Sequence, residues 1–205
     1  MNSIPFSSAA ERNRRPILET LRLLLPDAGT LLEIGSGTGQ HAVFLSQNLP
    51  GLSWQPSDRE ENLAGLEACF SAGGNERILP LLKLDVLSDP WPGRSYDAVF
   101  TANTAHIMPW EAVIAMFAGV GAHLVSGGRF CLYGPFNVDN KFTSESNAQF
   151  DAQLRSQNSQ MGIRDMAAIA NLANLNQMHL EQKITMPANN FMLVLKKKRG
   201  RSKNH

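Results

Sequence analysis

The stretch that decides the fold is residues 31–41, "LLEIGSGTGQH". A short apolar run is followed by three glycines at alternate positions, Gly35, Gly37 and Gly39. Glycine reaches left-handed backbone conformations and carries no side chain, so a ligand can lie directly against such a turn. The pattern therefore predicts a strand, a tight turn that contacts a ligand, and a helix that starts near Gln40.

Apolar bursts alternate with amphipathic stretches along the rest of the chain. We expect strands at 30–34, 52–55, 79–84, 96–102, 129–133, 178–185 and 191–196, and helices at 40–48, 60–72, 110–124, 147–157 and 164–175. Such alternation is typical of a parallel sheet covered by helices on both faces. The last two strands are joined by "MPANN", which is too short for a crossover, so they should form an antiparallel hairpin. The sequence thus predicts an α/β, Rossmann-like fold with a seven-stranded, mostly parallel sheet.

Length and composition fit one domain. The chain has 205 residues, and we expect a single domain over 1–198, with 199–205 as a basic disordered tail. We expect residues 1–29 to form an N-terminal helical segment that lies over the ligand as a lid or simply covers the sheet, and Pro16 suits the first turn of a helix that ends near Leu25. Cys69 and Cys131 fit two reduced thiols in a cytoplasmic protein. No apolar run reaches the roughly 20 residues needed to cross a membrane.

The net charge of +1 is the sum of a basic C-terminal tail, residues 196–205, and a mildly acidic remainder, which we call the body. Residues 196–205 hold six Lys and Arg and no acid, and the remainder has thirteen basic and eighteen acidic residues. A mildly acidic body argues against nucleic acid as the main partner.

The glycine turn does not have the spacing of a phosphate site. A P-loop needs a lysine where this chain has Gln40 and His41, and the third glycine comes one residue too early for the dinucleotide pattern G-x-G-x-x-G. The acid Glu33 also precedes the turn, where it would repel a pyrophosphate and suit a cationic ligand. A ligand without phosphate is therefore favoured.

Two further acids follow the next two strands. Asp58 comes after the second strand and Asp85 after the third. Because parallel strands end at the same edge of an open sheet, these acids should gather at the ligand edge. Each alone also fits a solvated loop acid or a helix cap.

The acid-x-G-x-G-x-G pattern resembles motif I of the class I S-adenosylmethionine-dependent methyltransferases, over about residues 30–133, and the terminal hairpin extends this to about residue 198. The resemblance implies S-adenosyl-L-methionine as cofactor and a seven-stranded methyltransferase fold. The cofactor-binding residues it implies are Glu33, Gly35, Ser36, Gly37, Gly39, Asp58, Asp85, Val86 and Asn103. By this resemblance, the glycines approach the methionine and ribose parts of the cofactor, and Glu33 organises the turn. Asp58 would hold the ribose hydroxyls, and Asp85 with Val86 would hold the adenine. Asn103 would lie at the methionine end.

A larger set of motifs resembles the methyltransferase-like protein 26 family, whose function is unknown. The set comprises "AAERNRRPIL", "WQPSD", "NTAHIMPW", "YGPF", "SNAQFD", "GIRD" and "MPANN" together with the glycine turn. This resemblance covers about residues 5–197 and implies a stand-alone methyltransferase-like domain without naming a substrate.

Methyl transfer from a sulfonium is a direct displacement, so positioning supplies much of the acceleration and a general base is needed only for a protonated nucleophile. The catalytic candidates are His106 and Asn103, just past the fourth strand, although His106 equally fits a structural loop histidine. The topology places further substrate candidates on the same edge, namely Trp110, Asn137, Phe142, Asn147, Arg164, Asn189 and Asn190. We assign no metal ligands.

The sequence leaves three functions open. The first is a methyltransferase that acts on a small or medium-sized molecule. The second is a non-catalytic module that binds the cofactor or a partner, since no strong general base is evident. The third, which the glycine spacing and Glu33 disfavour, is an NAD-dependent oxidoreductase.

Overall fold

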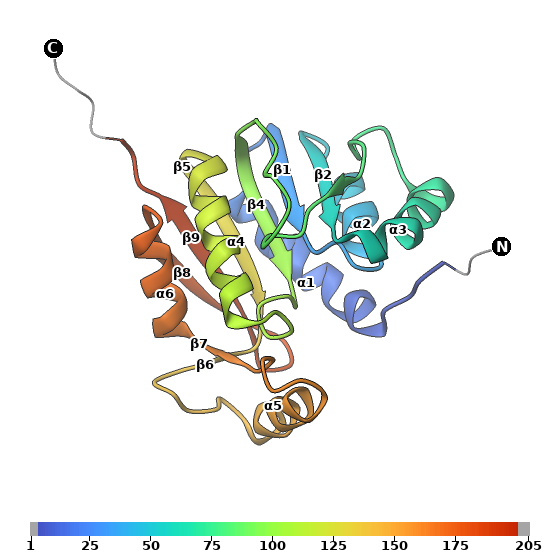
Figure 1. Cartoon of the computed structure of the whole chain (residues 1–205). Helices are drawn as coiled ribbons and strands as arrows, with labels where there is room; N and C mark the ends of the chain where they lie inside the picture. The colour runs from blue at the N-terminus through green and yellow to red at the C-terminus, as the bar shows by residue number, and fades with distance from the viewer. Residues whose placement is uncertain (1–3, 201–205) are drawn as a thin grey trace, which may run out of the picture.

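A computed structural model describes residues 4–200 of the chain (Figure 1). The helices are α1 (Ser8–Leu24), α2 (Gln40–Asn48), α3 (Glu60–Gly73), α4 (Trp110–His123), α5 (Glu145–Gln157) and α6 (Met166–Leu175). The strands are β1 (Gly29–Ile34), β2 (Leu52–Asp58), β3 (Leu82–Lys83), β4 (Tyr96–Ala102), β5 (Leu124–Gly134), β6 (Phe136–Asn137), β7 (Arg164–Asp165), β8 (Met178–Met186) and β9 (Asn190–Lys197). In this part of the chain no helix is both long and apolar enough to cross a membrane.

The main sheet has seven strands in the order β3-β2-β1-β4-β5-β9-β8. The strands β1 to β5 pair in parallel, whereas β9 is antiparallel to both β5 and β8. The predicted seven-stranded, mostly parallel sheet with an antiparallel C-terminal hairpin is therefore confirmed.

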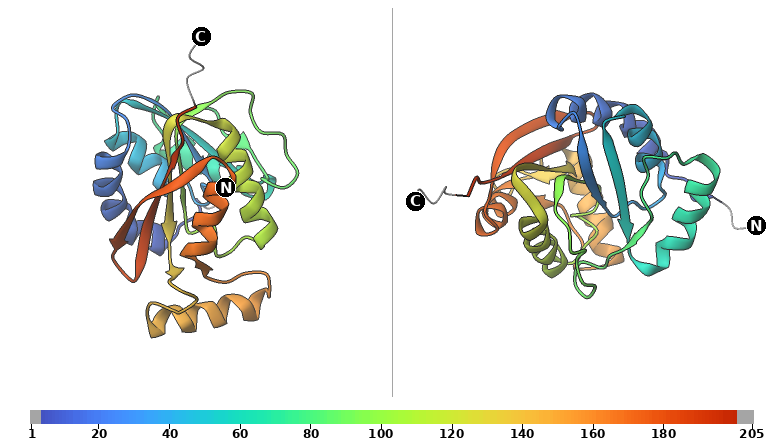
Figure 2. Two further views of the ribbon diagram at one scale, coloured as in Figure 1. Left: turned by 90° about the vertical axis from the view of Figure 1, so that its left-hand side faces the viewer. Right: turned by 90° about the horizontal axis from the view of Figure 1, so that it is seen from above.

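Helices cover both faces of this sheet (Figure 2). One apolar core lies beneath α4 and α6, with Phe117 and Ile169 fully buried in it. The other lies beneath α1 and α2, where Ile17 and Leu45 are fully buried. The apolar residues recur at helical spacing on the inner face of each helix, so burial of these faces explains why these segments are helical.

The carboxyl ends of β1, β2 and β4 meet at one edge of the sheet because the strands are parallel. The hairpin between β8 and β9 turns at the same edge, since Gly134 at the end of β5 pairs with Phe191. The helix α5 lies beyond this edge (Figure 1). The edge is thus framed by the glycine turn on one side and by α5 on the other.

The predicted third strand, 79–84, is wrong in extent. Only Leu82 and Lys83 pair with β2, and an isolated bridge joins Trp54 to Ile78. Pro80 lies between the two pairings and has no backbone N–H to give to a ladder, so the strand is interrupted there.

Two helix starts also differ from the sequence prediction. Arg164 and Asp165 were expected in a helix, but they pair with β6 in a short parallel sheet, and Asp165 caps α6 by accepting from the N–H of Ala167. Pro16 lies in the middle of α1 rather than in its first turn, because the helix begins earlier, at the cap Ser7. The predicted disordered tail falls mainly on residues 201–205, outside the described residues.

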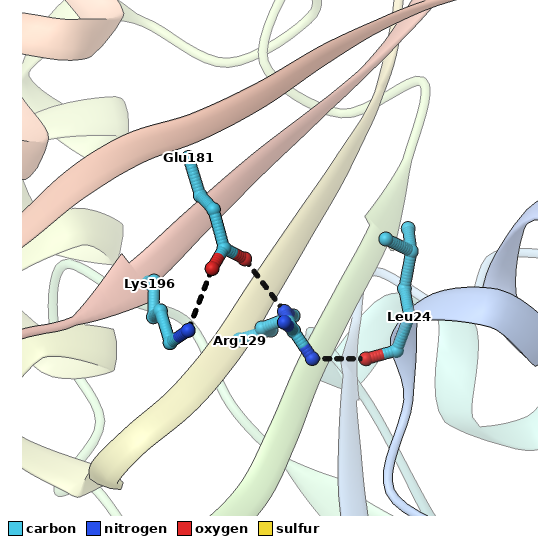
Figure 3. Close-up of polar contacts among 4 residues, drawn as sticks. All are labelled: Leu24, Arg129, Glu181 and Lys196. Atoms are coloured by element: carbon cyan, nitrogen blue, oxygen red, sulfur yellow. Dashed lines mark hydrogen bonds and ion pairs between the residues drawn. The ribbon is translucent and has the colours of Figure 1, made fainter.

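A polar cluster fastens the end of α1 to the sheet (Figure 3). Arg129 on β5 donates to the carbonyl oxygen of Leu24 at 2.8 Å and to Glu181 on β8 at 2.7 Å. Lys196 on β9 donates to the other oxygen of Glu181 at 2.6 Å. The hydrogen bonds from Arg129 and Lys196 lower the pKa of Glu181 to about 2. The cluster holds α1 in place at the end of the helix far from the ligand edge.

Candidate functional site

A cavity of about 380 Å³ opens at the carboxyl edge of the sheet, between the ends of β1, β2 and β4. Its walls are formed by Ser7, Ala10, Ile34, Gly35, Ser36, Gly37, Thr38, His41, Asp58, Arg59, Asn62, Leu84, Asp85, Val86, Leu87, Ala102, Asn103, Thr104, Ile107, Met108, Pro109 and Ala112. Most of the cofactor-binding residues predicted from the sequence are among them. The two that are not are Glu33 and Gly39.

The three glycines of the turn have different surroundings although all have positive φ. A Cβ on Gly35 would lie 2.7 Å from Thr104, and one on Gly39 would lie 2.9 Å from the sulfur of Cys69. A Cβ on Gly37 would meet nothing within 4 Å. Gly35 and Gly39 are therefore required by packing, whereas Gly37 faces the open cavity.

The backbone amides of the turn are already used within the protein. The N–H groups of Gly35 and Ser36 both donate to the carbonyl oxygen of Ser57 at 3.0 Å, and that of Gly37 donates to Oδ2 of Asp58 at 2.7 Å. The N–H of Gly39 donates to the carbonyl oxygen of Ser36. A phosphate-binding turn needs such amides free to point at the ligand.

Glu33 lies beneath the turn and is only 2 % exposed. One carboxylate oxygen accepts from the hydroxyl of Ser36 and from the indole N–H of Trp54, both at 2.9 Å. Burial outweighs these two bonds and raises the pKa of Glu33 to about 7. Glu33 therefore contacts the turn from below, and at neutral pH it is partly protonated, so it carries less than a full negative charge.

Asp58 and Asp85 both lie in the cavity wall. Besides Gly37, Asp58 accepts from the side-chain amide of Asn62 at 2.7 Å and from the N–H of Arg59 at 2.8 Å. Asp85 accepts from the N–H of Leu87 at 2.9 Å. These bonds hold both carboxylates in fixed orientations at the ends of β2 and β3.

Arg59 is the only Lys or Arg in the wall among the described residues, and it pairs with Glu61 at 2.5 Å. Within residues 4–200 no group of three or more His, Cys, Asp and Glu is placed to hold a metal ion.

The two catalytic candidates have different positions. Asn103 lines the cavity and adopts a φ of 59°, which is uncommon for a residue other than glycine. His106 is 5 % exposed and lies outside the cavity wall, where its ring packs edge-on against Phe150. Burial, with a smaller contribution from Arg164, lowers the pKa of His106 to about 4, so its ring is neutral at neutral pH.

The residues predicted to contact substrate lie outside the cavity wall. They are Trp110, Asn137, Phe142, Asn147, Arg164, Asn189 and Asn190. Arg164 donates to the carbonyl oxygens of Ala105 and Met108, and its guanidinium lies over the Trp110 ring. Asn147 donates to the carbonyl oxygen of Asn189, which ties α5 to the β8–β9 turn. In this structure Arg164 and Asn147 build the scaffold beside the cavity, and their contact with a substrate stays a prediction.

Sequence reasoning missed several wall residues. Ser7 and Ala10 belong to the segment suggested as a lid, and Ile107 and Met108 lie within a motif whose other residues were chosen. His41 was read only as the residue that stands where a P-loop has Lys or Ser. Its polar partner, Asn13, is 28 residues away, so no local spacing could have revealed their contact.

The comparisons with known proteins support the fold. A family model described as "Protein of unknown function (DUF938)" matches residues 4–197. An O-methyltransferase family protein from Burkholderia thailandensis superposes with a TM-score of 0.79 at 14 % identity, over 94 % of this chain and 58 % of that one. Human N-acetylserotonin methyltransferase, in complex with S-adenosylmethionine, superposes with a TM-score of 0.78 at 16 % identity, over 93 % of this chain and 53 % of that one.

A third structure, an O-methyltransferase family 2 protein from Planctomyces limnophilus in complex with apigenin, has a TM-score of 0.78 at 18 % identity, over 93 % of this chain and 58 % of that one. The chain therefore spans just over half the length of these proteins. At such identities the likeness establishes a shared methyltransferase-type Rossmann-like fold. The resemblance to the methyltransferase-like protein 26 family stays a prediction.

Proposed function

The chain belongs to the family described as "Protein of unknown function (DUF938)", and we propose for it the activity of an S-adenosylmethionine-dependent methyltransferase that acts on a small or medium-sized molecule. The observation that carries this proposal is that the backbone amides of the glycine turn are already hydrogen-bonded, although the turn lies beside an open cavity. The amides of Gly35, Ser36 and Gly37 are bonded within the protein, while the cavity in front of Gly37 is open and flanked by Asp58 and Asp85.

This arrangement suits a nucleoside without phosphate better than a dinucleotide. A pyrophosphate on the turn would find no free amide at residues 35–37 and would meet the carboxylate of Asp58 instead. S-adenosylmethionine carries a sulfonium and an ammonium group, and its ribose hydroxyls and adenine amino group donate hydrogen bonds. Carboxylates can accept from the ammonium, hydroxyl and amino donors, and their negative charge also suits the sulfonium.

In this proposal each part of the cofactor has its own residues. Asp58 binds the ribose hydroxyls, and Asp85 with the Val86 backbone binds the adenine. Gly37 lies against the ribose and methionine parts, and Asn103 lies at the methionine end, where the methyl group would be presented. Gly35, Gly39, Ser36 and Glu33 maintain the shape of the turn.

The acceptor would approach from the side of Ile107 and Met108, which line the cavity and follow Asn103 in the chain. A nucleophile on the acceptor would attack the methyl carbon as the carbon–sulfur bond breaks, and the displaced electrons would neutralise the sulfonium. The protein's main contribution would be alignment of nucleophile, methyl carbon and sulfur. An acceptor of small-molecule size is supported by the neighbour whose structure contains apigenin.

Calorimetry with S-adenosylhomocysteine tests the cofactor, and transfer of an isotope-labelled methyl group to a small-molecule extract tests the activity. We expect micromolar binding and a labelled product. Binding without transfer to any component would favour the non-catalytic module instead, and no heat at millimolar S-adenosylhomocysteine would contradict the proposal altogether.

A further inference from the structure

His41, in the first turn of α2, is a cavity residue for which the proposed function has assigned no role. Its side chain is 8 % exposed and lines the cavity together with Ser7 and Ala10 at the start of α1. The ring packs edge-on against Phe100 of β4, with 6.1 Å between the ring centroids. His41 therefore lies on the α1 side of the cavity, near the ends of β1 and β4.

The hydrogen bond of His41 determines which ring nitrogen carries the proton. Nε2 lies 2.7 Å from Oδ1 of Asn13 on α1, and an amide oxygen can only accept. In a neutral ring, Nε2 is then the donor and Nδ1 has a free lone pair.

The ring of His41 is neutral at physiological pH. Burial lowers its pKa to about 4, and the positive charge of Arg14 contributes in the same direction. A buried imidazole in this state offers one acceptor, which is Nδ1.

The second ring nitrogen, Nδ1, has no partner within the described part of the protein. Among the hydrogen bonds formed within residues 4–200, none involves Nδ1 of His41. In the same residues the side-chain nitrogens and oxygens that are fully enclosed without a partner are the hydroxyl of Tyr96 and Oδ1 of Asn137. Nδ1 is not among them, and His41 is one of the residues that line the cavity.

The strand order indicates which part of a ligand would meet this acceptor. Asp85 follows β3 and Asp58 ends β2, so the adenine and the ribose would lie over β3 and β2. The amino-acid end would then lie over β1 and β4, which is where His41 and Asn103 line the cavity. An ammonium group has only donors, so it matches a bare imidazole nitrogen.

We propose that Nδ1 of His41 accepts a hydrogen bond from the α-ammonium group of S-adenosylmethionine, and that Asn13 is a positioning residue that keeps the ring proton on Nε2. This inference rests on the proposed function. It adds a recognition contact for the amino-acid end of the cofactor that the glycine turn and the carboxylates do not provide.

Calorimetry with two ligands tests the contact. S-adenosylhomocysteine has the amino-acid end and 5′-methylthioadenosine lacks it. We expect His41→Phe to weaken S-adenosylhomocysteine about tenfold, the loss of one hydrogen bond to a charged group, and to leave 5′-methylthioadenosine unchanged. His41→Gln, whose amide oxygen can accept, should recover part of the affinity. His123→Phe, on α4 and outside the cavity wall, is the matched control and should change neither.

Asn13 is tested through its coupling to His41. Asn13→Leu should weaken S-adenosylhomocysteine selectively, and the double variant should bind no more weakly than His41→Phe alone, because both changes remove the same contact. Equal weakening of both ligands by His41→Phe, or no weakening of S-adenosylhomocysteine, would overturn the inference while the proposed function stands. Failure of the unaltered chain to bind S-adenosylhomocysteine would instead overturn the proposed function, and this inference with it.

Discussion

The backbone N–H of Gly37 donates a 2.7 Å hydrogen bond to Oδ2 of Asp58 and so joins the turn after β1 to the end of β2. This bond makes the glycine turn and the carboxylate one unit of the cavity wall. It also occupies the backbone N–H of Gly37, which a bound phosphate would need as a donor. The space that a side chain at Gly37 would fill is open. A cavity built in this way favours a nucleoside that donates hydrogen bonds.

Asp58→Asn tests the carboxylate in this unit. We expect S-adenosylhomocysteine to bind at least tenfold more weakly, because a neutral amide is a weaker acceptor for two ribose hydroxyls than a carboxylate is. The measurement is calorimetry at pH 7.5, with thermal unfolding as a check on the fold. Asp27→Asn, an exposed acid outside this cavity, is the control. Equal affinities for Asp58→Asn and the unaltered chain would exclude Asp58 as a ligand-binding residue.

Substitution of Gly37 tests whether its open side is the ligand's space. Gly37→Leu should abolish binding of S-adenosylhomocysteine, because the side chain would extend into the cavity. Gly37→Ala has the same left-handed backbone strain, about 1 kcal/mol in unfolding free energy, but adds only a methyl group, so it separates the strain of the turn from the blocked space. Gly93→Leu adds the same side chain at a glycine that also has no neighbour within 4 Å, but outside the cavity wall. Persistent binding by Gly37→Leu would place the ligand elsewhere.

Glu33 gives the stability of the protein a specific pH dependence. Its pKa is raised from 4.5 to about 7, so the folded protein binds this proton more tightly than the unfolded chain does. Stability from Glu33 is therefore fully present at low pH and is lost as pH rises through about 7, by about 3 kcal/mol in all. Relative to Glu33→Gln, the unaltered chain should lose stability between pH 5 and pH 8 in denaturant titrations. Parallel pH profiles for the two proteins would show that Glu33 is ionised in the fold.

Glu181 should behave in the opposite way. Its pKa is lowered to about 2, so its contribution is present above about pH 4.5 and is lost as pH falls toward 2. Because the ion pairs of Glu181 are partly exposed, we expect Glu181→Gln to lower the free energy of unfolding by only about 1 kcal/mol at pH 7. The difference between the two proteins should be smaller at pH 3. Glu76→Gln, which removes an exposed pair 3.6 Å long, should have no measurable effect. A larger difference in unfolding free energy at pH 3 than at pH 7 would contradict the lowered pKa of Glu181.

The sheet was predictable because its signals are local. The apolar run before Gly35 and the short link between β8 and β9 each specify an element within a few residues. The errors arise where a distant partner decides the outcome. Pro80 interrupts the predicted third strand. Arg164 pairs with Phe136 of β6, a residue far away in the sequence, and so lies in a strand instead of a helix.

Part of the cavity wall was predictable from the sequence, while its function as a cofactor site stays a prediction. Acids at strand ends can be recognised from sequence because the topology brings those ends together. The charge state of Glu33 could not be, because it depends on burial under a turn and on Trp54. The contact between His41 and Asn13 likewise depends on how α1 packs on α2, which no spacing encodes.

The central claim is that this cavity binds S-adenosylmethionine rather than a dinucleotide. The most direct measurement is a crystal structure of the chain soaked with equal concentrations of S-adenosylhomocysteine and NAD. We predict S-adenosylhomocysteine alone, with its ribose hydroxyls on Asp58 and its amino-acid end beside Asn103. NAD in the cavity, with its pyrophosphate on the amides of residues 35–39, would contradict the account.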